Sequence, residues 1–358
     1  PCPWPNSTGK PTAWMRTRRL PDLSALLRLA TVSADELLLR VGSRILGTVG
    51  KQDNGVLEFK TSYAGTLKVK WSEIVELRTD EPVKVMLKND DIIETTAIRN
   101  TEDVVTLQTG TQDEPEPVEL AQSDIAFVNP EAWRLGEGYK FTGRANLAFE
   151  SERGNSDTDE LDMDFEMTYR RLKDRFVAYG ELERDRDNER NKDVTTDDNW
   201  KLNGRYHRFI TDKWFWGGTL GFDADDKADR ELRVVAGPLV GYQFFESRPM
   251  NLRTEVGITR VHEEYKNESD NNYTAGAWEI TFDKYLFKEF MQFYHRQNGL
   301  LSFEDASDVI WNTWTGFRFP LVFGFVASTE LQTEYDGGAA RDADDLDTTY
   351  LLKLGYEW

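Results

Sequence analysis

The chain has 358 residues, of which 44 are Lys or Arg and 64 are Asp or Glu, so its formal net charge is −20 at pH 7. This acidic balance argues against nucleic acid as a partner, because phosphate binding needs a basic face. No apolar run reaches the ~18 residues that a membrane helix needs. Aromatic residues make up 12% of the chain, which is too many for a disordered protein. The single cysteine excludes disulfide frameworks and cysteine zinc sites. An outer-membrane β-barrel fits this composition, because only every second residue of its strands has to be apolar.

Residues 1–34 differ from the rest of the chain. Residues 1–14 are rich in proline and show no periodicity. From Met15 a basic segment, a short apolar stretch and small residues at 32–34 follow, which is the order of a secretory signal peptide and its cleavage site. Asp22 and Arg28 interrupt the apolar stretch, so a disordered tail is the alternative interpretation.

Residues 35–130 predict a small β-domain with an internal repeat. Short β-patterns alternate with turn signals such as Asn54-Gly55. Residues 87–93 echo 39–45 and residues 103–107 echo 55–59 at an offset of 48, and residues 123–127 echo 72–76 at an offset of 51. Each unit has enough short strands for an SH3-like or Sm-like barrel. The comparison with Sm proteins concerns shape only, because the acidic segment 111–119 argues against RNA binding. We interpret the domain as a packing module in the periplasm, and a module that binds peptidoglycan or a periplasmic protein is the alternative.

Apolar and polar residues alternate from Tyr139 onward, which places the two sets on opposite faces of β-strands. Most of these strands are longer than the ~5–6 residues common in soluble sheets. Short connections alternate with mostly longer ones rich in Asp, Asn and Gly, as periplasmic turns and external loops do in outer-membrane barrels. We therefore predict that residues 131–358 form an antiparallel transmembrane barrel of about twelve strands, with a soluble β-sandwich or barrel as the alternative. The predicted strands lie near residues 139–150, 159–171, 175–185, 198–209, 214–223, 230–245, 251–262, 273–283, 287–302, 308–319, 321–335 and 348–358.

The last strand carries a further signal. Five alternating residues, the last of them aromatic, share one face: Tyr350, Leu352, Leu354, Tyr356 and Trp358. This pattern is typical of the C-terminal signal that the barrel assembly machinery reads in bacterial outer-membrane proteins. Several tryptophans also fall near predicted strand ends, as aromatic girdles require. We expect a Gram-negative outer-membrane protein with its N-terminal domain in the periplasm, in contact with membrane lipids, lipopolysaccharide and the assembly machinery.

The first predicted external loop carries a recognisable motif. The segment ESERGNSDT at residues 150–158 leads into MTYRR at residues 167–171 and DRF at residues 174–176. This resembles the YdiY-like family of salt-induced outer-membrane proteins, whose function is unknown, and Gly-Asn-(Ser/Thr) is the most recognisable motif of that family. The resemblance covers about residues 139–358, and the preceding β-module also looks like one found ahead of such barrels. It implies a Gram-negative outer-membrane barrel and no established reaction or ligand.

The polar face of the predicted strands is expected to line the lumen. Unpaired charge in a low-dielectric interior is costly, so these groups either pair into a plug or stay hydrated along a narrow aqueous channel. Width does not decide between the two, because twelve strands lie between filled barrels of about eight and open barrels of about 16–18 strands. The predicted lumen-lining residues are Lys140, Arg144, Asp162, Asp164, Glu166, Lys201, Arg205, His207, Arg233, Arg253, Glu255, Glu279 and Asp283.

We predict no catalytic residue, no metal site and no cofactor. His207, His262 and His295 are the only histidines. His295 lies near Asn298 and Ser302, which loosely resembles the Ser/His/Asn set of outer-membrane phospholipases, so a hydrolase is a less favoured alternative. The Asp-rich segments 223–229 and 342–347 are interpreted as solvated external loops, with weak Ca²⁺ binding as the alternative.

The favoured function is a passive narrow pore or an envelope-integrity protein. The alternative is a non-conducting membrane scaffold whose periplasmic domain binds peptidoglycan or a protein partner.

Overall fold

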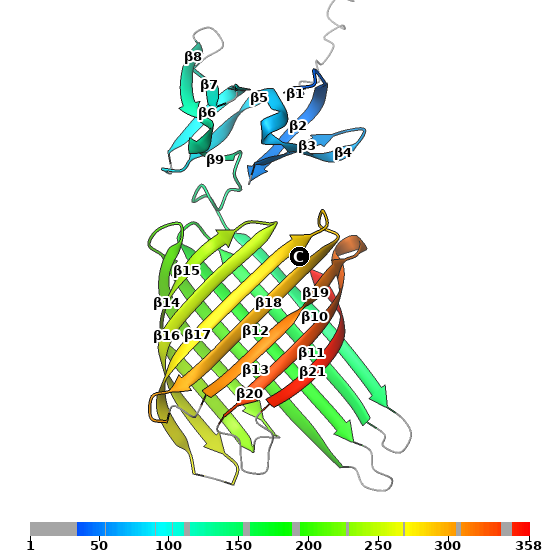
Figure 1. The fold of residues 1–358 in the computed structure, drawn as a ribbon, viewed down its shortest axis with the longest axis vertical. Coiled ribbons are helices and arrows are strands. Elements are labelled where there is room, and N and C mark those ends of the chain that lie inside the picture. The colour runs from blue at the N-terminus through cyan, green and yellow to red at the C-terminus, as the bar shows by residue number, and fades with distance from the viewer. Residues whose placement is uncertain are drawn as a thin grey trace, which may run out of the picture.

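The computed structural model describes residues 34–53, 55–89, 91–101, 103–110, 115–152, 158–187, 194–226, 229–267, 269–305, 309–337 and 346–358. They form an N-terminal sheet domain followed by a closed β-barrel (Figure 1). Within these ranges, no helix has the length and apolar character needed to span a membrane. Nearly all of the signal-like segment, the Gly-Asn motif of the first loop and much of the Asp-rich segment 342–347 lie outside the described residues.

The sheet domain contains nine strands and two short 3-10 turns. The strands pair in the order β4-β3-β2-β1-β5-β6-β7-β8, and β9 bonds to both β2 and β5. The elements are β1 (Asp35–Leu39), β2 (Arg44–Asp53), β3 (Val56–Thr61), β4 (Gly65–Lys70), η2 (Trp71–Glu73), β5 (Ile74–Leu87), β6 (Ile92–Asn100), β7 (Val104–Gly110), β8 (Pro115–Ala121), η3 (Gln122–Asp124) and β9 (Ile125–Val128).

The two sequence units correspond element by element in this domain. The backbone hydrogen bond from Leu39 N to Ser43 O recurs from Leu87 N to Asp91 O. Buried core residues recur at the same offsets, as the pairs Leu37 and Val85, Leu57 and Val105, and Leu77 and Val128. The units nevertheless form one sheet rather than two separate small barrels, because the 14-residue β5 belongs to both of them.

The second part of the chain is a closed antiparallel barrel of twelve strands, as the alternation predicts. It closes between the first and last strands, where Gly143 and Trp358 exchange two backbone hydrogen bonds of 3.0 and 3.1 Å. The strands are β10 (Lys140–Glu152), β11 (Thr158–Arg170), β12 (Asp174–Asp187), β13 (Val194–Phe209), β14 (Trp214–Asp225), β15 (Arg230–Glu246), β16 (Met250–Tyr265), β17 (Asn271–Leu286), β18 (Met291–Ser302), β19 (Val309–Pro320), β20 (Phe325–Asp336) and β21 (Leu346–Glu357).

Two strands were predicted to begin four residues too early. The ninth barrel strand begins at Met291 rather than at residue 287, because Phe287, Lys288 and Glu289 all adopt positive φ, which is incompatible with an extended strand. The eleventh begins at Phe325 rather than at residue 321, because a 3-10 turn containing Phe323 at φ 59° intervenes. Both segments form turns at the end of the barrel next to the sheet domain.

The two ends of the barrel differ. Figure 1 shows the short turns and the C-terminus at the end next to the sheet domain. We call this the near end, and the opposite end the far end. The two ends of the barrel sequence therefore lie on the same side as the N-terminal domain.

The outer wall of the barrel is apolar and exposed. The five residues of the C-terminal pattern, Tyr350 to Trp358, are between 43% and 78% exposed on this wall. An exposed apolar surface of this kind is typical of a face that meets lipid. Other exposed residues of the wall include Phe141, Phe149, Met163, Phe176, Leu202, Trp216, Leu220, Val240, Val256 and Ile258.

Candidate functional site in the barrel lumen

The inner wall carries charged side chains that meet across the lumen. Strand alternation turns one set of residues inward, and twelve strands bring them within reach of one another. Glu255 on β16 and Glu279 on β17 are the centre of this arrangement, and each side chain is only 3% exposed. We call them, with Arg205, His207, Arg253 and Arg296, the central network.

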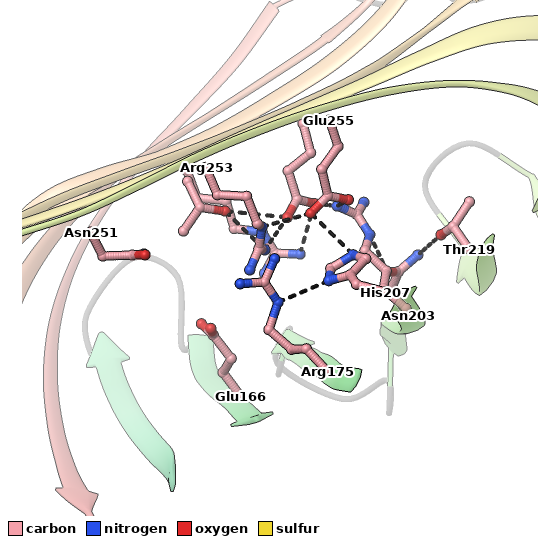
Figure 2. Close-up of polar contacts among 12 residues, drawn as sticks. Glu166, Arg175, Asn203, His207, Thr219, Asn251, Arg253 and Glu255 are labelled. Atoms are coloured by element: carbon pink, nitrogen blue, oxygen red, sulfur yellow. Dashed lines mark hydrogen bonds and ion pairs between the residues drawn. The ribbon is translucent and has the colours of Figure 1, made fainter. Parts of the chain in front are cut away.

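The central network joins strands that are not neighbours in the barrel. Arg205 on β13 contacts Glu279 and lies 3.3 Å from Glu255. Arg253 lies 2.6 Å from Glu255 and 3.0 Å from Glu279. Arg296 on β18 approaches Glu279 at 3.6 Å. Two carboxylates therefore hold three guanidinium groups together inside the barrel (Figure 2).

His207 extends the central network toward β12. Arg175 Nε donates a hydrogen bond to His207 Nδ1 at 2.9 Å, and His207 Nε2 lies 3.2 Å from Glu255 (Figure 2). Because Nδ1 accepts, the imidazole carries its proton on Nε2, where it faces the carboxylate. The side chain of His207 is fully buried, and Arg175 Nη1 also donates to Gln243 on β15 at 2.5 Å.

A stack of rings and guanidinium groups lies at the near end of the lumen. Arg170 lies between Trp133 and Phe209, 4.8 and 4.0 Å from the ring centroids, and Arg175 lies 5.1 Å from both Phe209 and Phe215. Trp133 belongs to the segment between the two parts of the chain and is 4% exposed. We call this segment, residues 129–139, the connecting segment. The indole of Trp133 therefore covers the near end of the lumen.

The connecting segment contacts both the sheet domain and the barrel. Arg134 stacks on Phe127 of the sheet domain at 4.3 Å and donates to the backbone oxygen of Glu246 in the barrel. Glu131 accepts from Lys51 at 2.7 Å and from Trp133 at 2.8 Å. Burial alone would raise the pKa of Glu131, but these hydrogen bonds and the nearby lysine charges lower it to about 2.

Further ion pairs cross the lumen outside the central network. Lys201 on β13 meets Glu334 on β20, and Lys353 on β21 contacts Asp164 on β11 at 2.8 Å. Arg296 on β18 stacks on Tyr179 of β12 at 3.9 Å. Cavities of about 120 Å³ and 30 Å³ remain between these contacts.

Most of the predicted lumen-lining residues have their contacts inside the barrel. Arg205, His207, Arg253, Glu255 and Glu279 form the central network, as described above. Elsewhere Arg144 pairs with Glu166, Arg233 with Asp223, Asp283 with Arg318, and Asp164 and Lys201 make the contacts already given.

Two of the predicted lumen-lining residues, Asp162 and Lys140, have other surroundings. Asp162 is 9% exposed, and its strand neighbour is Glu183. Lys140 is exposed and pairs with Glu131 of the connecting segment at 3.3 Å, so it contributes to the near end rather than to the lumen wall.

Sequence reasoning missed Arg296, Glu246, Trp133 and Trp314. Arg296 was obscured by the misplaced start of its strand, although Tyr294, Arg296 and Asn298 alternate on one face. The connecting segment has no alternation, so nothing in the sequence indicated that Trp133 covers the lumen.

The three residues of the hydrolase alternative are not brought together. His295 pairs with Thr315 on the neighbouring strand at 2.8 Å. Because alternate residues face opposite sides of β18, His295 points away from the side on which Asn298 and Ser302 lie. In the part of the chain that the structure describes, no three His, Cys, Asp or Glu side chains are grouped so that they could hold a metal ion.

Comparisons with known proteins give one family and several barrel structures. The translocator domain of the autotransporter NalP from Neisseria meningitidis is 9% identical, over 62% of this chain and 88% of that one, with a TM-score of 0.34. The outer membrane channel DcaP of Acinetobacter baumannii is 10% identical, over 79% and 95%, with a TM-score of 0.31. No curated protein matches the chain. Residues 145–358 match the family described as "Protein of unknown function, DUF481", and the chain belongs to that family.

Proposed function

We propose that this chain is a β-barrel of the Gram-negative outer membrane whose lumen is closed at rest and which holds its sheet domain in the periplasm. The exposed apolar outer wall supports the membrane location, because a closed barrel with such a wall buries it in lipid. The outward residues would contact lipid and lipopolysaccharide, and the C-terminal strand would be read by the assembly machinery. In this orientation the near end, with its short turns, faces the periplasm.

The central network is the main observation that supports a closed lumen. Glu255 and Glu279 hold arginines from β13, β16 and β18, and all of these side chains are at most 13% exposed. Removing one partner of a buried ion pair costs about 3–5 kcal/mol. If opening separates one such pair at a similar cost, the open state is populated at roughly one part in 10² to 10⁴.

Planar bilayers test this proposal. We expect the wild-type full-length protein to give no steady conductance, and the double variant Glu255→Gln/Glu279→Gln to give frequent openings. The control is Asp198→Asn, which changes an exposed pair with Arg184 outside the lumen. Steady conductance of the wild-type protein at low voltage would contradict the proposal.

The passive narrow pore is the second candidate function. The cavities of about 120 and 30 Å³ favour it, because both are lined by Tyr179, Arg296 and Trp314, which would form the narrowest point between them. A pore predicts wild-type conductance that increases when Arg296 is shortened to Ala. A protein that is silent in both forms would rule out this pore.

The sheet domain would be the part that acts in the periplasm. A peptidoglycan or protein partner of residues 35–130 remains a proposal that cross-linking in intact cells can test. We expect cross-linked species that disappear when residues 35–130 are deleted while the barrel still assembles. Identical cross-linked species without the domain would contradict such a partner.

A further inference from the structure

The larger cavity of the lumen is lined mainly by positive charge. Its volume is about 120 Å³, well above the ~10–15 Å³ that a cavity needs to hold one water molecule. Its lining residues Lys201, Asp223 and Arg233 lie farther from the near ends of their strands than Glu255 and Glu279 do, so the two carboxylates lie between most of the cavity and the near end. Among the described lining residues, Asp223 is the only carboxylate, whereas the cations are Lys201, Arg205, Arg233 and Arg296.

Arg296 is the least neutralised of these cations. Lys201 has Glu334, and Arg233 has Asp223 at 2.9 Å. Among the described residues, Arg296 pairs with Glu279 at 3.6 Å, and Arg205 and Arg253 also contact that carboxylate. The central network thus carries one more guanidinium group than carboxylates. Of its two arginines that line the cavity, Arg205 contacts both carboxylates, whereas Arg296 approaches only Glu279.

Lining residues of the cavity also hold buried donors without acceptors. Arg296 Nε and Trp314 Nε1 have no hydrogen-bond partner, and Arg233 Nη1 has none within hydrogen-bond distance. A buried donor without an acceptor costs about 1–3 kcal/mol. The guanidinium of Arg296 instead stacks on Tyr179 at 3.9 Å and on Trp314 at 5.2 Å, which holds it at the cavity wall.

We infer that this cavity binds a small oxyanion, a carboxylate or an inorganic phosphate, with Arg296 as its principal partner. An oxyanion brings only acceptors, so it can satisfy donors that the protein leaves unpaired. Its charge offsets the excess guanidinium of the central network, and its size suits the cavity volume. The oxyanion enters from the far end, because Trp133 and the central network close the other path.

Calorimetric titration of the full-length protein in detergent micelles tests the inference. The probes are sodium phosphate and sodium acetate, each at constant ionic strength maintained with chloride. We expect saturable binding of at least one probe at concentrations of ~1 mM or below. Arg296→Gln should weaken it about tenfold or more, because a hydrogen bond to a charged group is lost. The matched control Arg318→Gln removes another buried lumen arginine, which pairs with Asp283 and does not line this cavity, and should leave affinity within about twofold.

A second variant keeps the test decisive if Arg296→Gln does not fold. Trp314→Phe keeps the aromatic ring and removes the Nε1 donor, and we expect it to weaken binding by about threefold. Unboiled samples that migrate differently from boiled ones establish that each variant is folded. Absence of saturable binding to the wild-type protein, equal loss in Arg296→Gln and Arg318→Gln, or unchanged affinity in Trp314→Phe would each overturn the inference. None of these readouts depends on whether the barrel conducts.

Discussion

Replacing Glu279 by Gln removes a carboxylate that three guanidinium groups share. Glu279 contacts Arg205, lies 3.0 Å from Arg253 and 3.6 Å from Arg296, and its side chain is 3% exposed. Gln has almost the same shape, so the substitution changes charge without opening a cavity. Arg205 and Arg253 would then keep only Glu255, and Arg296 would lose its ion pair with Glu279. Breaking buried pairs by removing one partner costs about 3–5 kcal/mol.

We therefore expect Glu279→Gln to lower the free energy of unfolding by about 3 kcal/mol or more. The assay is urea unfolding of the barrel in detergent micelles, followed by tryptophan fluorescence and by the loss of heat-modifiable migration. Asp198→Asn is the matched control, because Asp198 and Arg184 are 41% and 49% exposed and such surface pairs contribute about 0–1 kcal/mol. A loss for Glu279→Gln no larger than that of the control would refute the view that the central network stabilises the barrel.

Three further predictions concern the ends of the barrel. Trp133→Ala should expose the near end of the lumen, so that trypsin cleaves the connecting segment faster than in the wild-type protein. The control Trp214→Ala changes an exposed tryptophan and should leave the cleavage rate unchanged. Equal cleavage rates in the two variants would contradict the view that Trp133 covers the lumen. Because the pKa of Glu131 is lowered from 4.5 to about 2, its contribution to docking is complete above pH 4.5 and is lost as the pH falls toward 2. Cleavage of the connecting segment by pepsin, which is active in acid, should therefore accelerate over this range relative to cleavage of the unfolded chain. Glu131→Gln should remove that acceleration, and a persistent acceleration would point to another group. Deleting Trp358 removes both backbone bonds to Gly143, so the heat-modifiable fraction in outer-membrane preparations should fall; an undiminished fraction would show that barrel closure does not need them.

The sequence by itself determined the architecture, because architecture follows from local periodicity. Alternation of apolar and polar residues is a property of each strand alone, so the twelve strands and their two faces could be predicted. The offsets of 48 and 51 residues likewise identified the two corresponding units of the sheet domain. The errors fell where local pattern and backbone conformation disagree, as at Phe287 and Phe323, whose positive φ values end the extended chain.

Only the tertiary structure decided which lumen charges meet. Alternation assigns a side chain to the inner face, but its height relative to a distant strand depends on strand tilt and register around the closed barrel. Lys201 and Glu334, which are 133 positions apart, therefore became partners only on closure. The same holds for Trp133, whose segment has no periodicity to predict its position. The sequence therefore determined the barrel and its charged interior, and the closure of the barrel decided that those charges join across the lumen.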